Sequence, residues 1–208
     1  MSLNKKLLSA LILSFLFFYS CSEKKQEANQ DELNKNYSNP SYVLTQAKNI
    51  LGNDVKETFK GRFDRDSVIE VIAGTETSNK TQWGIRFYFL KMKNGELTKI
   101  WQTDLLQGSF KGSLCDKIKF PYFDHELVYY NSKDYFLGSG GGEVFTYIIN
   151  FQDYKTYYAH LVDERGKPVS LFVSDNIDVP EIHNFFVGIF KKDYPALKLV
   201  DKDIQLRY

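Results

Sequence analysis

Three acidic side chains fall within the stretch FKGRFDRDSVIEVIAG (residues 59–74), where they could together hold a cation. Asp64 and Asp66 occupy alternate positions just before a run of apolar residues, and Glu70 lies within that run. Carboxylate oxygens at alternate loop positions are ligands that suit Ca²⁺, but this loop lacks a third ligand between them and the glycine that permits a sharp turn. We therefore expect a solvated turn before a strand and no metal site. If a metal did bind here, its candidate ligands would be Asp64, Asp66 and Glu70.

The same stretch resembles a degenerate repeat of the FG-GAP or VCBS type, in which an acidic, glycine-rich loop enters a strand and sometimes holds calcium in a propeller blade. The three carboxylates match acidic positions of that pattern, whereas Ser67 and Val68 stand where Asn or Asp and Gly are expected. One clear copy is present, with a fainter echo at residues 110–112. Repeat folds need several units to bury their faces, so the resemblance leaves a partial propeller as one option among several.

Glycine is concentrated in the stretch LGSGGGEVF (residues 137–145). A phosphate-binding loop would carry Gly-Lys-Ser/Thr or G-x-G-x-x-G between a strand and a helix, and this stretch has neither pattern. Closely spaced glycines in a strand context indicate a wide hairpin or a bulge, or a close approach of the backbone to a ligand. The candidates for such ligand contacts are Gly138, Gly140, Gly141 and Gly142.

The three histidines occur in unrelated contexts. His125 and Glu126 begin like a zinc-binding H-E-x-x-H motif, but Tyr129 occupies the position of the second histidine. His160 falls in a predicted strand and His183 in the predicted last helix. We therefore expect satisfied or surface histidines and predict no catalytic residues and no cofactor.

Aromatic residues are abundant, with 17 Phe and 14 Tyr. A tyrosine on an exposed sheet face can stack on a sugar or a peptide, because it presents an apolar ring with a polar end. Adjacent residues of a strand point to opposite faces, so one member of each adjacent tyrosine pair is expected outside the core. The candidates for ligand contact from these pairs are Tyr129, Tyr130, Tyr157 and Tyr158.

The first twenty residues are laid out as a secretory signal. Lys5 and Lys6 precede the run LLSALILSFLFF (residues 7–18), which is apolar apart from two serines. A helix of this length rises only about 18 Å, against roughly 30 Å of hydrocarbon, which suits a signal peptide and not an ordinary membrane span. Residues 1–20 are therefore excluded from the fold.

Cys21 follows this apolar run in the sequence FFYSCS, which resembles the lipobox of bacterial lipoproteins. The resemblance implies that the Cys21 thiol carries a diacylglyceryl group and that the signal is removed just before it. Phe18 and Tyr19 depart from the leucine and the small residue that are commonest there. Two or three acyl chains hold a protein stably on a membrane, whereas a single chain does so only reversibly. An uncleaved anchor or a simple secreted protein is the alternative.

Residues 21–40 are mostly charged or amide side chains and are expected to form a lipidated, flexible tether. Residues 41–208 have the length and composition of a single globular domain. Without Lys5 and Lys6, 25 basic and 26 acidic residues remain, so the net charge is near −1 and gives no sign of a nucleic-acid partner.

Cys115 is the only other cysteine. If Cys21 is acylated, no internal disulfide can form. Cys115 alternates with apolar residues in a plausible strand, which favours a buried and inert thiol.

The periodicity predicts a mainly β domain of antiparallel sheets with one N-terminal and one C-terminal helix. Apolar spacing indicates helices at 41–51 and 180–192. Asn94 and Gly95 predict a type I′ turn in a hairpin of residues 83–103. Both faces of its first strand are apolar, so the sheet should be covered on two sides; a sandwich, a barrel and a partial propeller all remain open. Further strands are predicted at 68–73, 117–120, 126–130, 133–137, 143–151, 156–162 and 169–174.

These observations together indicate a lipoprotein of the bacterial cell envelope, anchored on the periplasmic or the surface face of a membrane through its N-terminal lipid. We expect a noncatalytic binding or assembly module whose partner is an envelope protein or a glycan, and not nucleic acid. Two alternatives remain. One is an envelope hydrolase using carboxylates such as Asp64, Asp66 or Glu143, and the other is a barrel that carries an apolar ligand.

Overall fold

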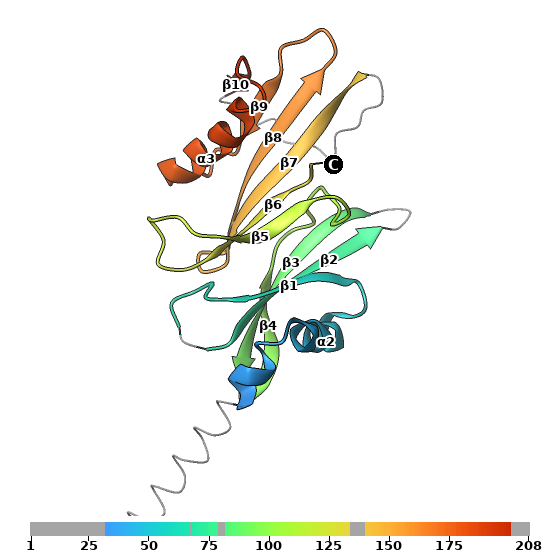
Figure 1. Cartoon of the computed structure of the whole chain (residues 1–208), viewed down its shortest axis with the longest axis vertical. Coiled ribbons are helices and arrows are strands. Elements are labelled where there is room, and N and C mark those ends of the chain that lie inside the picture. The colour runs from blue at the N-terminus through green and yellow to red at the C-terminus, as the bar shows by residue number, and fades with distance from the viewer. Residues whose placement is uncertain (1–31, 67, 79–81, 134–139, 201–208) are drawn as a thin grey trace, which may run out of the picture. The chain divides into compact units, whose positions relative to one another are not determined.

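A computed structural model describes residues 32–66, 68–78, 82–133 and 140–200 of the chain (Figure 1). The predicted signal peptide, Cys21, the first part of the predicted tether, Gly138 and nearly all of the predicted strand 133–137 lie outside these residues. The described chain is mainly β, as the sequence predicted, with two sheets and few helices. Its contacts divide the chain into two compact units, Met1–Val43 and Leu44–Tyr208, and both sheets belong to the second.

Local hydrogen bonds give residues 32–39 more structure than their polar composition suggested. Residues 32–36 are helical, and the backbone N–H of Tyr37 donates to the carbonyl oxygen of Leu33 at 2.9 Å. Helix α2 (Pro40–Leu51) follows, close to the predicted bounds. Its start is fixed by Asn39, whose side-chain oxygen accepts the N–H of Ser41 at 3.0 Å, as a helix cap does.

The first sheet is a meander of four antiparallel strands in the order β1-β2-β3-β4. Asn94 and Gly95 join β3 to β4 with φ values of 52° and 85°, which confirms the positive φ that a type I′ turn requires. The strands of this sheet are β1 (Val55–Gly61), β2 (Glu70–Ser78), β3 (Trp83–Lys93) and β4 (Glu96–Gln102).

The second sheet has six strands in the order β10-β9-β8-β7-β6-β5. All neighbours are antiparallel except β9 and β10, which are parallel because helix α3 (Pro180–Lys191) crosses over between them. The strands are β5 (Leu114–Ile118), β6 (Leu127–Asn131), β7 (Gly141–Asn150), β8 (Lys155–Glu164), β9 (Ser170–Val173) and β10 (Lys198–Val200).

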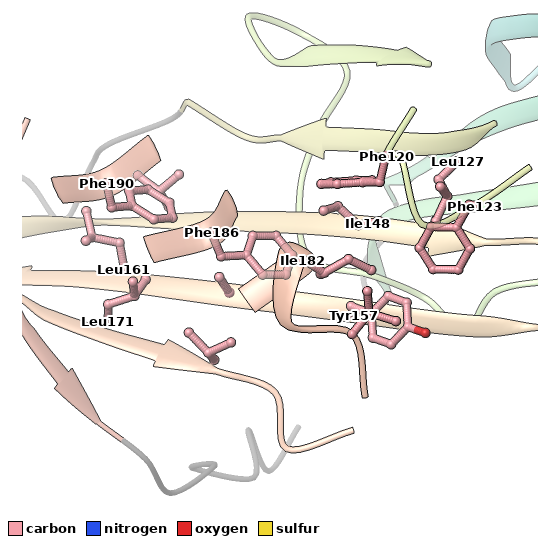
Figure 2. Packing of buried hydrophobic residues seen from close by; sticks show 14 residues of the cluster. Phe120, Phe123, Leu127, Ile148, Tyr157, Leu161, Leu171, Ile182, Phe186 and Phe190 are labelled. Carbon is pink, nitrogen blue, oxygen red and sulfur yellow. The ribbon is translucent and has the colours of Figure 1, made fainter. Parts of the chain in front are cut away.

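Helix α3 packs on one face of this second sheet. Ile182, Phe186 and Phe190 recur at every fourth position, so they share one side of the helix and are buried. They share one core with the second sheet, in which Phe190 lies toward Leu161 and Leu171 of β8 and β9, and Ile182 lies toward Tyr157 of β8 (Figure 2). Odd-numbered residues of β8 and β9 therefore face α3, and even-numbered ones face the opposite side.

The opposite side of the second sheet packs, over part of its length, against the first sheet. Their shared core confirms that strand β3 has two apolar faces, because Leu90 and Met92 are buried on its other face. Neither sheet closes into a barrel, since each has two edge strands in the described part of the chain. The buried members of this shared core are Phe63, Ile72, Ile85, Phe87, Phe89, Val128, Tyr130, Tyr147, Ile149 and Phe151.

Candidate functional site

The acidic loop between β1 and β2 closes around a lysine from a neighbouring strand. Lys91 of β3 lies directly opposite Glu70 of β2 in the sheet register. The Lys91 ammonium is 2.5 Å from the Asp64 carboxylate, contacts the Asp66 carboxylate and lies 3.7 Å from Glu70 Oε1. The three carboxylates were identified from the sequence, and the structure shows that Lys91 is the cation beside them.

Glu70 is the buried centre of this cluster, with a side chain that is 0% exposed. Its Oε2 accepts the backbone N–H groups of Phe63 and Asp64, which fixes the loop against the strand. Burial, together with a hydrogen bond to Asp64, raises the pKa of Glu70 to about 8. Glu70 Oε1 is buried without a hydrogen-bond partner among the described residues, which costs less for a protonated, uncharged carboxyl group than for a carboxylate.

Asp64 and Lys91 are the charged pair of the cluster. Partial burial acts to raise the pKa of Asp64, but hydrogen bonds with Glu70 and Lys91 outweigh it and lower that pKa to about 2. Burial acts to lower the pKa of Lys91, but its bonds to Asp64 and Asp66 outweigh that effect and raise it. The cluster therefore holds an ionised aspartate and an ammonium at neutral pH.

A divalent cation fits this arrangement poorly. The carboxylate oxygens of Asp64, Asp66 and Glu70 lie within 4.8 Å of one another, as metal ligands would. The Lys91 ammonium already contacts two of them and approaches the third, so a metal would first have to displace it. We therefore assign this cluster to holding the loop.

The glycine stretch lies where β7 begins. Gly141 has a φ of 136°, and a Cβ there would lie 1.7 Å from the carbonyl oxygen of Asp163 in β8. Position 141 therefore requires glycine, because the backbone of β8 lies too close for any side chain. Gly142 pairs with Asp163, and the carbonyl oxygen of Gly140 accepts the N–H of Arg165 at 2.8 Å, so this stretch also fixes the turn that follows β8.

A row of rings crosses the sheet near that turn, on the face opposite α3. The register places Phe145 of β7, His160 of β8 and Phe172 of β9 side by side. The rings of Phe145 and His160 stack with centroids 4.4 Å apart, and those of His160 and Phe172 are 6.0 Å apart. Burial lowers the pKa of His160, although Glu143, whose carboxylate lies 3.0 Å from its Nε2, opposes that effect.

A cavity of about 310 Å³ adjoins Phe172. Its apolar lining comes from Val162, Pro168 and Phe172. The register places Val162, Ser170 and Lys198 in a second cross-strand row on that face. The polar lining comes from Glu164, Lys167, Ser170 and Lys198. Sequence reasoning missed this site, because the pairing of β10 with β9 follows only from the crossover through α3.

The four candidate tyrosines divide as the alternation of a strand requires. Tyr130 and Tyr157 are buried at 0% and 1% exposed. The Tyr130 hydroxyl donates to the carbonyl oxygen of Ser109 at 2.8 Å, so its polar end is satisfied inside the protein. Tyr129 and Tyr158 are half-buried and pack against the two cores, and neither lines the cavity.

Two further titratable residues, His125 and Cys115, are explained by their surroundings in the fold. His125 is buried, and its two ring nitrogens lie 3.1 Å from Asp124 Oδ1 and 3.0 Å from Asn150 Oδ1. Cys115 is half-buried, and burial raises the pKa of its thiol, which makes the thiolate scarce and the residue unreactive.

The carboxylates named for a hydrolase do not form one site. Asp64 and Asp66 are both bonded to Lys91 at the first sheet, whereas Glu143 is in β7 of the second sheet, bonded to His160.

No protein-family model, curated protein or solved structure matches the chain. Among the residues that the structure describes, no helix is both long enough and apolar enough to cross a membrane.

Proposed function

We propose that this chain is a lipid-anchored protein of the bacterial cell envelope that acts as a noncatalytic binding module. The observation that carries the binding role is the cavity beside Phe172. Ligand sites are concave and largely apolar, with a few polar groups, and a volume of about 310 Å³ is at the lower end of their range. Such a cavity suits a small molecule or a short part of an envelope protein or glycan.

The absence of a catalytic role is supported by how the candidate groups are used. In the described part of the chain, Asp64 and Asp66 form ion pairs with Lys91, and His125 is enclosed between Asp124 and Asn150. None of these groups lines the cavity. A paired-carboxylate hydrolase needs two carboxyl groups facing a cleft, and the cavity lining supplies a single carboxylate, from Glu164.

The anchor is supported by the sequence around Cys21, which follows a signal-like apolar run and is preceded by no other cysteine. We expect Cys21→Ala to be exported without acylation, because the thiol is the acceptor and the signal is unchanged. Growth with radioactive palmitate, followed by isolation of the chain, measures this. A labelled Cys21→Ala protein would disprove the anchor and leave the binding role to be tested by itself.

Binding is tested with the full chain, purified in detergent and used to retain components of an envelope extract. Phe172→Leu should reduce retention of the specific component severalfold at unchanged melting temperature. The matched control is Tyr122→Ala, which removes a ring that is 66% exposed in a loop of the same sheet and outside the cavity. Equal retention by wild type and Phe172→Leu would remove the cavity from the proposed function. Turnover of a glycan or peptide by the purified chain would replace it with the hydrolase alternative.

A further inference from the structure

The cavity beside Phe172 has an uneven distribution of charge. Lys167 and Lys198 supply two ammonium groups, and Glu164 supplies the only carboxylate of the lining. Lys167 already contacts Glu164, in a pair whose side chains are 69% and 46% exposed. Lys198 has no ion pair with any residue that the structure describes. The lining therefore has a net positive charge, and Lys198 carries the excess.

The positions of these groups separate an apolar part from a charged part. Val162, Phe172 and Pro168 form apolar walls, with the Phe172 ring beside His160. Ser170 and Lys198 are Cα partners across β9 and β10, so their side chains leave the sheet on the same face, and both line the cavity. The Ser170 hydroxyl donates to the carbonyl oxygen of Pro168 at 3.3 Å, which leaves its oxygen able to accept another hydrogen bond.

We propose that the ligand of this cavity is a small organic anion. Its apolar or planar body would lie against Val162 and Phe172, and its anionic group would pair with the Lys198 ammonium. An ammonium is a point charge without the bidentate geometry of arginine, so it accepts a carboxylate or a phosphate. A volume of about 310 Å³ suits a small molecule or one end of a larger one.

This inference rests on the proposed binding role and names the chemistry of its ligand. The expected charge effect is modest. Lys198 is exposed, and ion pairs at exposed sites contribute on the order of 1 kcal/mol or less, which corresponds to about fivefold in affinity. Screening by salt should weaken binding further, because the charge is within reach of solvent.

The test uses the full chain in detergent, with ¹³C-labelled valine methyl groups as reporters, since Val162 lines the cavity. Benzoate, phenyl phosphate and the neutral benzyl alcohol are titrated in turn, at low and at high sodium chloride. Both anions should shift the Val162 signal and bind severalfold more tightly than benzyl alcohol at low salt. The preferred anion then distinguishes a carboxylate ligand from a phosphate ligand.

Variants link the effect to the residue. Lys198→Met should reduce affinity for the anions about three- to fivefold and leave benzyl alcohol unchanged. Lys99→Met, which removes an exposed lysine from β4 of the other sheet, is the matched control and should change neither. Equal binding of all three probes, or an anion affinity that is unchanged in Lys198→Met, overturns the anionic ligand while the binding role stands. If no probe shifts Val162, the anionic ligand is also overturned, and the retention experiment with Phe172→Leu decides the binding role separately.

Discussion

The acidic loop and the cavity use the same kinds of side chain in opposite ways. At the loop, the Lys91 side chain is 13% exposed and meets three carboxyl groups, one of them on the fully buried Glu70. At the cavity, Lys198 is exposed, and no described carboxylate pairs with it. Charge at the loop is paired within the protein and holds the fold, whereas we propose that the ammonium at the cavity pairs with a ligand.

Substituting the two lysines tests this difference most directly. Lys91→Met should lower the free energy of unfolding by about 2 to 3 kcal/mol, because the largely buried Asp64 carboxylate loses its charged hydrogen-bond partner. Lys198→Met should change it by less than about 0.5 kcal/mol, as surface substitutions do. Urea denaturation of both variants measures the two values. Similar losses in the two variants would contradict the assignment of one lysine to stability and the other to binding.

At the end of the second sheet next to the cavity, stability depends on close backbone contact between β7 and β8 and not on charge. Substitutions at two neighbouring glycines test this. Gly141→Ala should destabilise the protein by about 2 to 3 kcal/mol, since its Cβ would collide with the backbone of β8. Gly140→Ala is the neighbouring control, because a Cβ there meets nothing within 4 Å. Thermal melting compares the two. A stable Gly141→Ala protein would mean that β7 and β8 can separate at this end without loss.

The acidic loop should also make stability depend on pH. The folded state raises the pKa of Glu70 to about 8, above its value in the unfolded chain. The folded chain therefore binds the extra proton between about pH 4.5 and 8, and its stability falls as the pH rises through that window. We expect a loss of about 2 kcal/mol between pH 5.5 and 8, within the limit of about 1.4 kcal/mol per pH unit.

Glu70→Gln provides the control for this pH dependence. Its amide resembles the protonated acid, so it should retain the bond to Asp64 and remain stable at pH 8. Burial lowers the pKa of His160, which makes stability rise with pH near neutrality, and subtracting the Glu70→Gln profile removes that opposing contribution. Identical pH profiles of wild type and Glu70→Gln would show that Glu70 is ionised throughout.

Most of the fold follows from local patterns in the sequence. Alternation of apolar residues predicted the strands from β2 to β9 that lie in described residues, although β5 (Leu114–Ile118) begins three residues before the predicted strand 117–120, and Asn94 with Gly95 predicted the hairpin turn. Strands β1 and β10 were missed. The first has no clear alternation of apolar and polar residues, and the second has three residues and pairs only after the crossover through α3.

The acidic loop was easier to predict from the sequence than the cavity, because the cavity depends more on how the strands pair. Asp64, Asp66 and Glu70 are close in sequence, so their cluster was visible, whereas Lys91 joins them only through the register of β2 with β3. Six of the seven residues that line the cavity lie within residues 162–172, but they meet only because β8 pairs with β9, and Lys198 joins them only through the pairing of β10 with β9. Sites formed by strand pairing need the register, which local patterns do not supply.

The smallest expected effect is that of calcium on stability. It tests whether the acidic loop holds the Lys91 ammonium or a metal ion. Adding 5 mM Ca²⁺ to the wild-type chain should shift the melting temperature by less than about 1 °C, because the Lys91 ammonium already contacts both the Asp64 and the Asp66 carboxylate and calcium would have to displace it. A ligand at about 100 times its dissociation constant would add about 2.7 kcal/mol, which corresponds to several degrees for a domain of this size. Melting with calcium and then with chelator measures the shift. A shift of several degrees that Asp64→Ala abolishes would show that calcium displaces the ammonium, and the loop would then be a binding site like the cavity.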